Sequence, residues 1–233
     1  MIEMPPPPQW AAVAAAAARL QAIVPDAVLV GGTGAALHAR HRVSFDDDHV
    51  LADLRERFDE ILAHLEQSDG WVTARVNRPV LILGSLDGIE TGIRQLLRRR
   101  PLEVEELETP SGVLRVPTLE EMLRVKAWLV LRRNATRDYL DVVALAKRLG
   151  VDPAARVLLE LDRYYEDQIG AGGRRIATQL ARQLARPAPY DLSEVDLRTY
   201  RELASPWREW DAVVAACRRI ADAMLDQAAQ EAG

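Results

Sequence analysis

Between Val28 and Leu51 the chain reads VLVGGTGAALHARHRVSFDDDHVL. An apolar run ends in Gly31-Gly32, an alanine-rich segment follows, and a second short run carries Asp46 and Asp48 two residues apart. Apolar runs separated by glycines and a helix-forming segment predict the order strand, glycine turn, helix, strand.

The two ends of this stretch suit two parts of one ligand, a metal-bound nucleoside triphosphate. Glycines let backbone N–H groups approach phosphates where the next helix begins. Carboxylates at i and i+2 of a strand project from one face, where Mg²⁺ or Mn²⁺ can join them to phosphate oxygens. Each end alone has a plainer interpretation, a tight turn for the glycines and a solvated loop for the aspartates. Their order and spacing together favour a nucleotide site.

Composition places the chain among ordinary water-soluble proteins. It has 233 residues, of which 48% are apolar and 28% charged, and a net charge of −5. This charge gives no global basic field for nucleic acid, although Arg98–Arg100 and Arg132-Arg133 form local basic groups. The single cysteine, Cys217, excludes an internal disulfide. With no membrane-length apolar run and no signal-peptide pattern, we expect a cytoplasmic protein without membrane association.

The apolar period changes along the chain and divides it into two predicted domains. After a proline-rich lead-in from Pro5 to Pro8, the pattern predicts helices over 10–23, 33–40 and 53–67, and strands over 27–30 and 45–51. From 71 to 116 the period is two, which predicts five further strands, with Leu86-Asp87-Gly88 as a hairpin turn. Thr118 and Glu121 then form a capping box that opens a helical region. We therefore predict an α+β domain over residues 1–117, with a mixed sheet and flanking helices, and an α-helical domain over residues 118–233.

A two-metal site for phosphoryl transfer needs a third carboxylate beside the Asp46/Asp48 pair. Glu90 is the best-placed candidate, on the polar face of the strand predicted over 89–97. Arg94 shares that face, so the alternative is an edge-strand Glu90 paired with Arg94.

A second group of charged residues lies between Leu119 and Leu149. Lys126, Arg133 and Arg137 are spaced so that one continuous helix would place them on one face, although Arg133-Asn134 could equally be a break. Asp138 and Asp141 follow. Composition alone favours a solvated helix with weak intrahelical Arg–Asp pairs.

These motifs together resemble the signature of polymerase-beta-type nucleotidyltransferases, and within them the AbiEii/AbiGii-type toxins. The likeness rests on Gly31-Gly32, on Ser44 with Asp46-x-Asp48, and on Lys126 followed by Arg137-Asp138-x-x-Asp141. One position departs from that pattern, because Asp47 stands where the family has an apolar residue and is followed by His49. An inward-facing Asp47 needs a partner, and Arg40 or Arg42 could supply one.

The resemblance implies an enzyme that transfers a nucleoside monophosphate from a nucleoside triphosphate to a hydroxyl group of RNA, such as tRNA, or of a protein. Asp46 and Asp48 would hold Mg²⁺ or Mn²⁺, and Glu90 would help to activate the acceptor. The phosphates would contact the remaining residues of the first motif, namely Gly31, Gly32, Thr33 and Ser44. Lys126 would neutralise the triphosphate, and Arg137 and Asp138 would line or brace the nucleotide pocket, so that the helical domain completes the site. A toxin-like role and a separately encoded antitoxin are also implied.

Two alternatives stay open at this point. Asp47, His49 and the absence of a third aspartate fit a degenerate member that binds nucleotide without transferring it. The helical half could instead dock a partner protein, with no enzymatic activity.

Overall fold

The computed structural model describes residues 8–169, 173–200 and 202–232. Most of the proline-rich lead-in, Pro5 to Pro7, lies outside these ranges. The chain forms two compact units, which are discontinuous in sequence. The sheet unit takes in the described residues up to Gly34 with Val43–Leu97 and Pro101–Pro117, and the helical unit takes in Ala35–Arg42, Arg98–Arg100 and the described residues from Thr118 onward.

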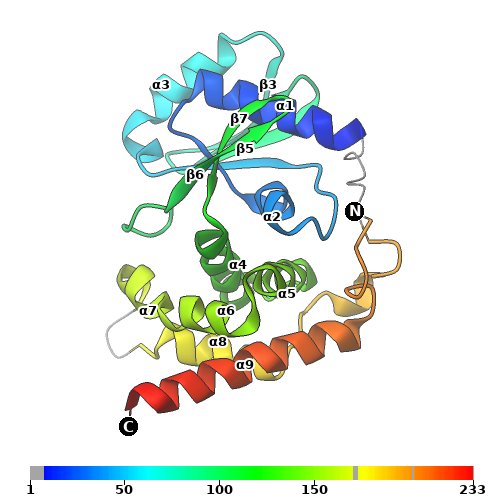
Figure 1. Ribbon diagram of the computed structural model, residues 1–233. Coiled ribbons are helices and arrows are strands. Elements are labelled where there is room, and N and C mark those ends of the chain that lie inside the picture. Colours follow the sequence, from blue (N-terminus) through cyan, green and yellow to red (C-terminus); the bar gives the residue numbers. More distant parts are fainter. Residues whose placement is uncertain (1–7, 170–172, 201, 233) are drawn as a thin grey trace. The chain divides into compact units, whose positions relative to one another are not determined.

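The sheet unit is built on a mixed sheet, as the sequence predicted, and this sheet has five strands (Figure 1). The strand order is β1 (Val28–Leu29), β2 (Asp47–Leu51), β5 (Ile89–Gln95), β4 (Leu81–Leu86) and β3 (Trp71–Asn77). Strands β2 and β5 are parallel, and the other neighbours are antiparallel. The predicted hairpin joins β4 to β5 at Asp87 and Gly88, whose φ angles of 52° and 80° suit a turn with two left-handed central residues.

Helices α1 (Pro8–Ile23) and α3 (Leu54–Glu66) cover one face of this sheet (Figure 1). The apolar stripe of α3 is buried and shares a core with α1 and the strands; it consists of Leu54, Phe58, Ile61, Leu62 and Leu65. Core members include Leu20 of α1, Phe58 of α3 and Ile93 of β5. Each such side chain contributes about 1.5–3 kcal/mol by leaving water.

A separate two-stranded sheet pairs β6 (Val104–Thr109) with β7 (Gly112–Pro117). Gln21 of α1 makes two hydrogen bonds to the backbone of Arg115 in β7. Its Nε2 donates to the Arg115 carbonyl at 2.9 Å, and its Oε1 accepts from the Arg115 N–H at 2.8 Å. One side chain thus satisfies both main-chain groups of a strand residue.

The two boundaries nearest the first motif differ from the prediction. Helix α2 runs over Gly31–Ala39, so the glycine pair forms its first turn instead of a turn before it. Strand β2 begins at Asp47, two residues later than expected, and Ser44 to Asp46 form an irregular approach to it. Gly31 has φ +63°, which allows the chain to enter the helix directly from β1.

The helical unit begins with α4 (Leu119–Arg133), whose capping residue Thr118 accepts a hydrogen bond from the Glu121 N–H at 3.2 Å, as the capping box predicted. Asn134 ends α4 in a left-handed conformation with φ 52°, and α5 then starts at Thr136. Of the two alternatives that the sequence left open for Lys126, Arg133 and Arg137, a continuous helix or a break, the break is therefore correct. The other helices are α5 (Thr136–Leu149), α6 (Val151–Leu159), α7 (Leu161–Tyr164), α8 (Ile176–Ala185) and α9 (Trp210–Ala232), with 3-10 turns at Glu166–Gln168 and Leu192–Glu194.

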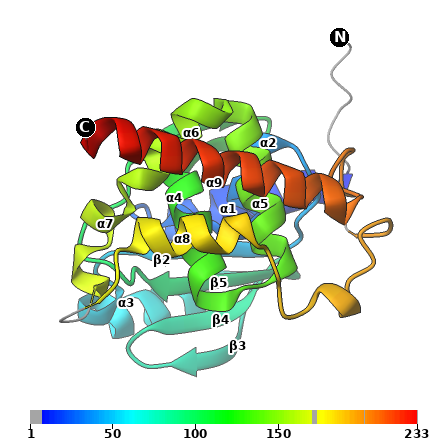
Figure 2. The same cartoon turned by 90° about the horizontal axis from the view of Figure 1, so that it is seen from below.

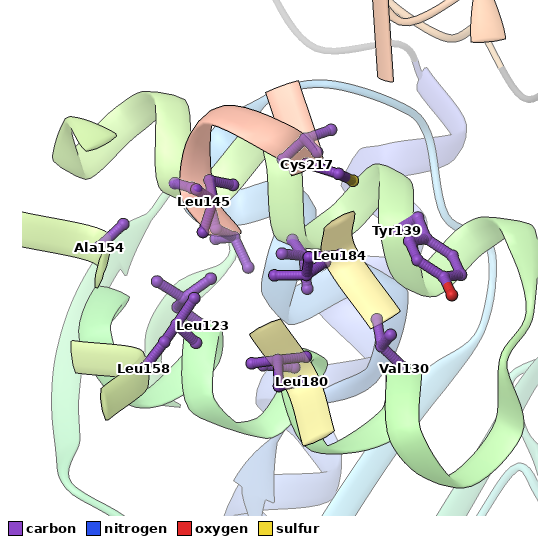
Figure 3. Packing of buried hydrophobic residues seen from close by; sticks show 14 of the residues in the cluster. Leu123, Val130, Tyr139, Leu145, Ala154, Leu158, Leu180, Leu184 and Cys217 are labelled. Carbon is purple, nitrogen blue, oxygen red and sulfur yellow. The ribbon is translucent and has the colours of Figure 1, made fainter. Parts of the chain in front are cut away.

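Helix α9 runs along α6 and α8 (Figure 2). The core of the helical unit draws fully buried side chains from five helices (Figure 3). Those labelled there are Leu123, Val130, Tyr139, Leu145, Ala154, Leu158, Leu180, Leu184 and Cys217. Burial raises the pKa of the Cys217 thiol to about 12, so this cysteine stays protonated and acts as an apolar packing group. No helix in the described ranges combines the length and apolarity needed to cross a bilayer.

Candidate functional site

Asp48 lies at the meeting point of β2, β5 and the start of α2 in the sheet unit. It is opposite Gly92 of β5 in the parallel ladder, and its side chain is 32% exposed. A Cβ at Gly31 would come within 2.9 Å of Asp48 Oδ2, and Gly31 also has a positive φ. Glycine at position 31 therefore lets the first turn of α2 approach the Asp48 carboxylate.

Asp46 and Asp48 are both partly exposed, whereas Asp47 and His49 are buried. Burial alternates from Asp46 to His49, but Asp46 precedes β2, so of the two outer carboxylates only that of Asp48 lies on a strand. Thr33 of α2 donates a hydrogen bond from Oγ1 to the Asp46 carbonyl at 2.6 Å. The hydroxyl of Thr33 thus ties the first turn of α2 to the approach to β2.

The β5 residues on the Asp48 face are Glu90, Gly92 and Arg94. Arg94 Nε lies 3.6 Å from Asp48 Oδ1, and both side chains are partly exposed, so this pair adds little stability. Glu90 is exposed. Among the described residues the ion-pair partner of Arg94 is Asp48 and not Glu90, so the predicted alternative of a Glu90–Arg94 pair was wrong.

The buried residues Asp47 and His49 face the core side of β2. Thr91 Oγ1 donates to Asp47 Oδ2 at 3.4 Å, and His49 Nδ1 lies 3.4 Å from Asp47 Oδ1. Burial, with a smaller contribution from Asp48, raises the pKa of Asp47 well above its usual range, and burial lowers the pKa of His49 to about 3. Both shifts favour the uncharged form of each side chain, because a charge at this position would be buried.

The helical unit contains a cluster of buried charges centred on Asp141 of α5. Arg42 binds this carboxylate through Nε at 2.8 Å and Nη2 at 3.1 Å, Lys126 Nζ lies 2.7 Å from Oδ2, and His41 Nε2 lies 2.7 Å from Oδ1. All four side chains are at most 2% exposed. Arg42, which the sequence offered as a partner for Asp47, binds Asp141 instead.

Charge balance keeps Asp141 ionised. Burial alone would raise its pKa, but Arg42, Lys126 and His41 together hold the pKa well below the usual range. Burial lowers the pKa of His41 despite its bond to Asp141, so the imidazole is neutral at pH 7 and donates its Nε2–H to the carboxylate. Burial also lowers the pKa of Lys126, against the attraction of Asp141. A central anion thus fixes the positions of two cations.

A family model described as "Nucleotidyl transferase AbiEii toxin, Type IV TA system" matches residues 18–231. The chain belongs to the AbiEii nucleotidyltransferase toxin family.

A solved structure supports the fold of this AbiEii-family chain. The crystal structure of a candidate nucleotidyltransferase from H. pylori superposes with a TM-score of 0.50, covering 91% of this chain and 95% of that one at 14% identity. The α+β nucleotidyltransferase fold with a helical C-terminal region, predicted from the sequence, is confirmed.

Part of the chain is also similar to much longer mycobacterial proteins. Over 133 residues it is 38% identical to the heme uptake protein MmpL11 of Mycobacterium tuberculosis, and over 132 residues 38% identical to the mycolic acid-containing lipids exporter MmpL11 of Mycolicibacterium smegmatis. Each match covers 56% of this chain and 13% of the relative. The chain spans only 13% of the length of each relative. The heme uptake and lipid export in their names therefore describe those proteins and are not assigned to this chain.

The other predicted residues of the AbiEii-family chain have different surroundings. Arg137 is exposed on α5. Asp138 is buried and binds Arg133 through two hydrogen bonds of 3.2 and 2.5 Å, so it holds the last turn of α4. Ser44 is 1% exposed, and its Oγ has no hydrogen-bond partner among the described residues.

Sequence reasoning missed His41, offered Arg42 to Asp47 instead of Asp141, and named Asp141 only as part of the downstream motif. The available signal was an ionisable residue at position 141 inside an apolar run, Tyr139 to Ala146, where an acid needs a buried partner. Nothing in the sequence indicates which residue is that partner, because Arg42 lies 99 residues earlier in the chain.

The donor atoms around Asp46 and Asp48 suit a hard divalent cation. Among the described residues no group of three or more His, Cys, Asp or Glu side chains could hold a metal by itself. Two carboxylates fit Mg²⁺ or Mn²⁺ when phosphate oxygens supply the other ligands, because Mg²⁺ is usually bound through one or two carboxylates plus substrate phosphates. The site is therefore suited to a metal that arrives with a nucleotide.

Proposed function

We propose that this chain is a Mg²⁺-dependent nucleotidyltransferase that transfers a nucleoside monophosphate from a nucleoside triphosphate to a hydroxyl group of RNA, such as tRNA. A protein hydroxyl is the alternative acceptor. The observation that carries the proposal is the approach of Gly31, at the start of α2, to the Asp48 carboxylate. A helix start that favours phosphate thus lies beside a carboxylate that favours a divalent cation.

In the sheet unit, Asp46 and Asp48 would hold Mg²⁺ or Mn²⁺, which neutralises charge on the phosphate oxygens when bound. The backbone N–H groups of Gly31 and Gly32 would bind phosphate oxygens, and Thr33 fixes that turn through its bond to Asp46. We assign the Ser44 hydroxyl, which is buried without a hydrogen-bond partner among the described residues, to a phosphate oxygen.

The acceptor hydroxyl oxygen would form a bond to the α-phosphorus while the bond from that phosphorus to the bridging oxygen breaks. Pyrophosphate leaves with that electron pair, and the hydroxyl proton passes to Glu90 or to solvent. Glu90 is exposed on the same face of the sheet as Asp48, which supports this assignment.

In the helical unit, we assign Lys126 to the triphosphate; its side chain is 2% exposed and its ammonium group is bound by Asp141, so nucleotide binding would have to expose it. Arg137 and Asp138 are assigned to the nucleotide pocket, Arg137 by contact and Asp138 by bracing Arg133. In the cell the protein would act as the toxin of a pair, and a separately encoded antitoxin would counter it.

The test is incubation of the purified protein with each of the four α-³²P-labelled nucleoside triphosphates, Mg²⁺ and total cellular RNA. The Asp46→Asn and Asp48→Asn variants remove the metal ligands, and Asp69→Asn, an exposed aspartate of the same unit, is the matched control. Label on RNA or protein with the wild type and Asp69→Asn, but not with the other two variants, supports the proposal.

Two other results would each replace it. Mg²⁺-dependent triphosphate binding without any transfer would identify a degenerate nucleotide-binding protein, an outcome suggested by the exposed Glu90 and by the Asp47–His49 pair. Absence of both binding and transfer would leave a partner-binding scaffold.

A further inference from the structure

Tyr190 is an exposed aromatic residue on a firmly held segment of the helical unit. Its side chain is 71% exposed, in contrast to the buried rings of Tyr164 and Tyr165. The Tyr190 N–H donates to the Asn134 carbonyl at 3.1 Å, and Asn134 Nδ2 donates to the Ala188 carbonyl at 2.8 Å. The backbone at and before Tyr190 is thus fixed to the end of α4.

The segment is held after Tyr190 as well. Asp191 Oδ1 accepts hydrogen bonds from the Thr136 N–H at 2.7 Å and from Thr136 Oγ1 at 2.8 Å. Asn134 is itself bound by the Tyr139 hydroxyl at 2.6 Å and by Gln183 Nε2 at 2.8 Å. The loop is therefore part of a hydrogen-bond network that joins α4, α5 and α8, and it presents the ring from a fixed backbone.

An exposed ring on a fixed backbone is prepared for stacking against another flat group. Little conformational entropy remains to be lost on binding, because the backbone is already ordered and tyrosine has only two side-chain torsions. Stacking on an aromatic ring suits every nucleic-acid base, since each base has a π face.

The elements that hold this loop also carry exposed arginines. Arg132 lies in the last turn of α4 and Arg186 just after α8, each two residues from a hydrogen-bonded residue of this network, Asn134 or Ala188. Asp138 is paired with Arg133, whereas Asp191 keeps its negative charge because Thr136 binds it through neutral groups, and Glu194 and Asp196 further along the chain are exposed. Arg132 and Arg186 have no carboxylate partner among the described residues, so each can pair with a phosphate.

We propose that Tyr190, Arg132 and Arg186 form a binding surface for single-stranded RNA, the acceptor strand of the proposed nucleotidyltransferase. An unpaired base stacks on Tyr190, and the arginines contact flanking phosphates. The strand is single because bases inside a duplex are already stacked on their neighbours and cannot receive the ring. The identity of the acceptor as RNA rests on the proposed function, whereas the surface rests on the geometry of this loop.

The test is the binding of a fluorescein-labelled single-stranded RNA of mixed sequence, about twelve nucleotides long to span a typical site, measured by anisotropy without nucleoside triphosphate. Tyr190→Ala is expected to weaken binding roughly fivefold or more, whereas Tyr190→Phe keeps the ring and stays near wild type. Leu225→Ala removes another exposed apolar side chain, 59% exposed on α9, and is the matched control. The same RNA annealed to its complement should bind more weakly than the single strand.

The arginines are tested through the salt dependence of the same binding. Arg132→Gln and Arg186→Gln are each expected to reduce the slope of log affinity against log salt by roughly 0.7, the value for one phosphate contact on a single strand. Equal affinity of Tyr190→Ala and wild type, duplex binding as tight as single-strand binding, or unchanged salt slopes would each overturn the proposal.

These experiments distinguish a failure of the proposed RNA-binding surface from a failure of the proposed transferase activity. If the wild type binds no RNA but still labels a protein with Mg²⁺ and a nucleoside triphosphate, the RNA surface is refuted and the transferase stands. If Tyr190→Ala weakens RNA binding while no triphosphate labels any acceptor, the surface stands and the transferase is refuted. If Tyr190→Ala weakens triphosphate binding as much as RNA binding, the ring serves the nucleotide, and the RNA assignment is overturned.

Discussion

Gly31 and Asp48 are packed so closely that a Cβ atom at position 31 would lie 2.9 Å from the Asp48 carboxylate oxygen Oδ2 and from its Cβ. The start of α2 and the centre of β2 therefore constrain each other directly. Any side chain at position 31 must displace the carboxylate that we assign to the metal.

Gly31→Ala is expected to lower both stability and triphosphate binding. The methyl group meets Asp48, and φ +63° is strained for alanine, which together cost about 1–3 kcal/mol. Gly88→Ala is the matched control, since φ there is +80° but no atom lies within 4 Å of the added Cβ. Urea denaturation and calorimetric titration with a triphosphate and Mg²⁺ measure the two effects. If the two variants bind triphosphate equally well, the contact with Asp48 has no functional weight.

Ser44→Ala separates stability from binding. The Ser44 hydroxyl is buried without a partner among the described residues, so its removal should leave the free energy of unfolding unchanged or raise it by about 1 kcal/mol. If the hydroxyl binds a phosphate oxygen, the same variant should weaken triphosphate binding roughly five- to tenfold. Unchanged binding would remove Ser44 from the phosphate site.

Asp141→Asn should be among the most destabilising single changes in the helical unit. It removes the anion that holds Arg42 and Lys126, and unpaired buried charges cost about 3–5 kcal/mol. Asp152→Asn, on an exposed position of α6, should change stability by at most about 0.5 kcal/mol. Adding Lys126→Met to Asp141→Asn should recover part of the loss in urea denaturation, and strict additivity of the two changes would contradict the coupling.

His49 should make the protein less stable in weak acid. Burial lowers its pKa to about 3, so below the ordinary value of about 6.5 the unfolded chain binds a proton that the folded chain does not. The contribution of the neutral His49 to the free energy of unfolding is fully present above pH 6.5. It is lost as the pH falls toward 3, by at most about 1.4 kcal/mol per pH unit. His49→Leu should flatten this part of the stability–pH curve, whereas the exposed-site variant His64→Leu should keep it.

Asp47 should change the stability of the protein with pH in the direction opposite to His49, and Asp47→Asn should remove that change. Burial raises the pKa of Asp47 well above its usual range, so its contribution is present below the unfolded value of about 4 and is lost as pH rises. The neutral asparagine should therefore be more stable than the wild type at pH 7, and the difference should vanish near pH 3.5. A destabilised Asp47→Asn protein at pH 7 would mean that the carboxylate is ionised in the fold.

Local sequence signals were sufficient for much of the fold. The stripe from Leu54 to Leu65, the hairpin at Asp87-Gly88 and the capping residue Thr118 were predictable because each depends on neighbours within one or two turns. The end of α4 at Asn134 was left open, since a helix-compatible pattern continues past it.

The candidate site was only partly accessible from sequence. The exposure of Asp48 followed from strand alternation, which is a local property, whereas Asp46 lies before β2. The environment of Asp47, which raises its pKa and places it beside His49 and Thr91, depends on burial and on pairing with a distant strand. The partners of Asp141 likewise come from a segment about a hundred residues away, and no periodicity in one sequence reports such a contact.

The two hydrogen bonds of Gln21 to Arg115 also have a consequence beyond the single molecule. A strand edge with free N–H and C=O groups is a template for pairing with another chain, and aggregation often begins at such edges. By occupying both groups of Arg115, helix α1 covers the middle of β7 and leaves a neighbouring polypeptide no matching donor and acceptor at that residue. One glutamine thus helps to protect the protein against self-association through this small sheet.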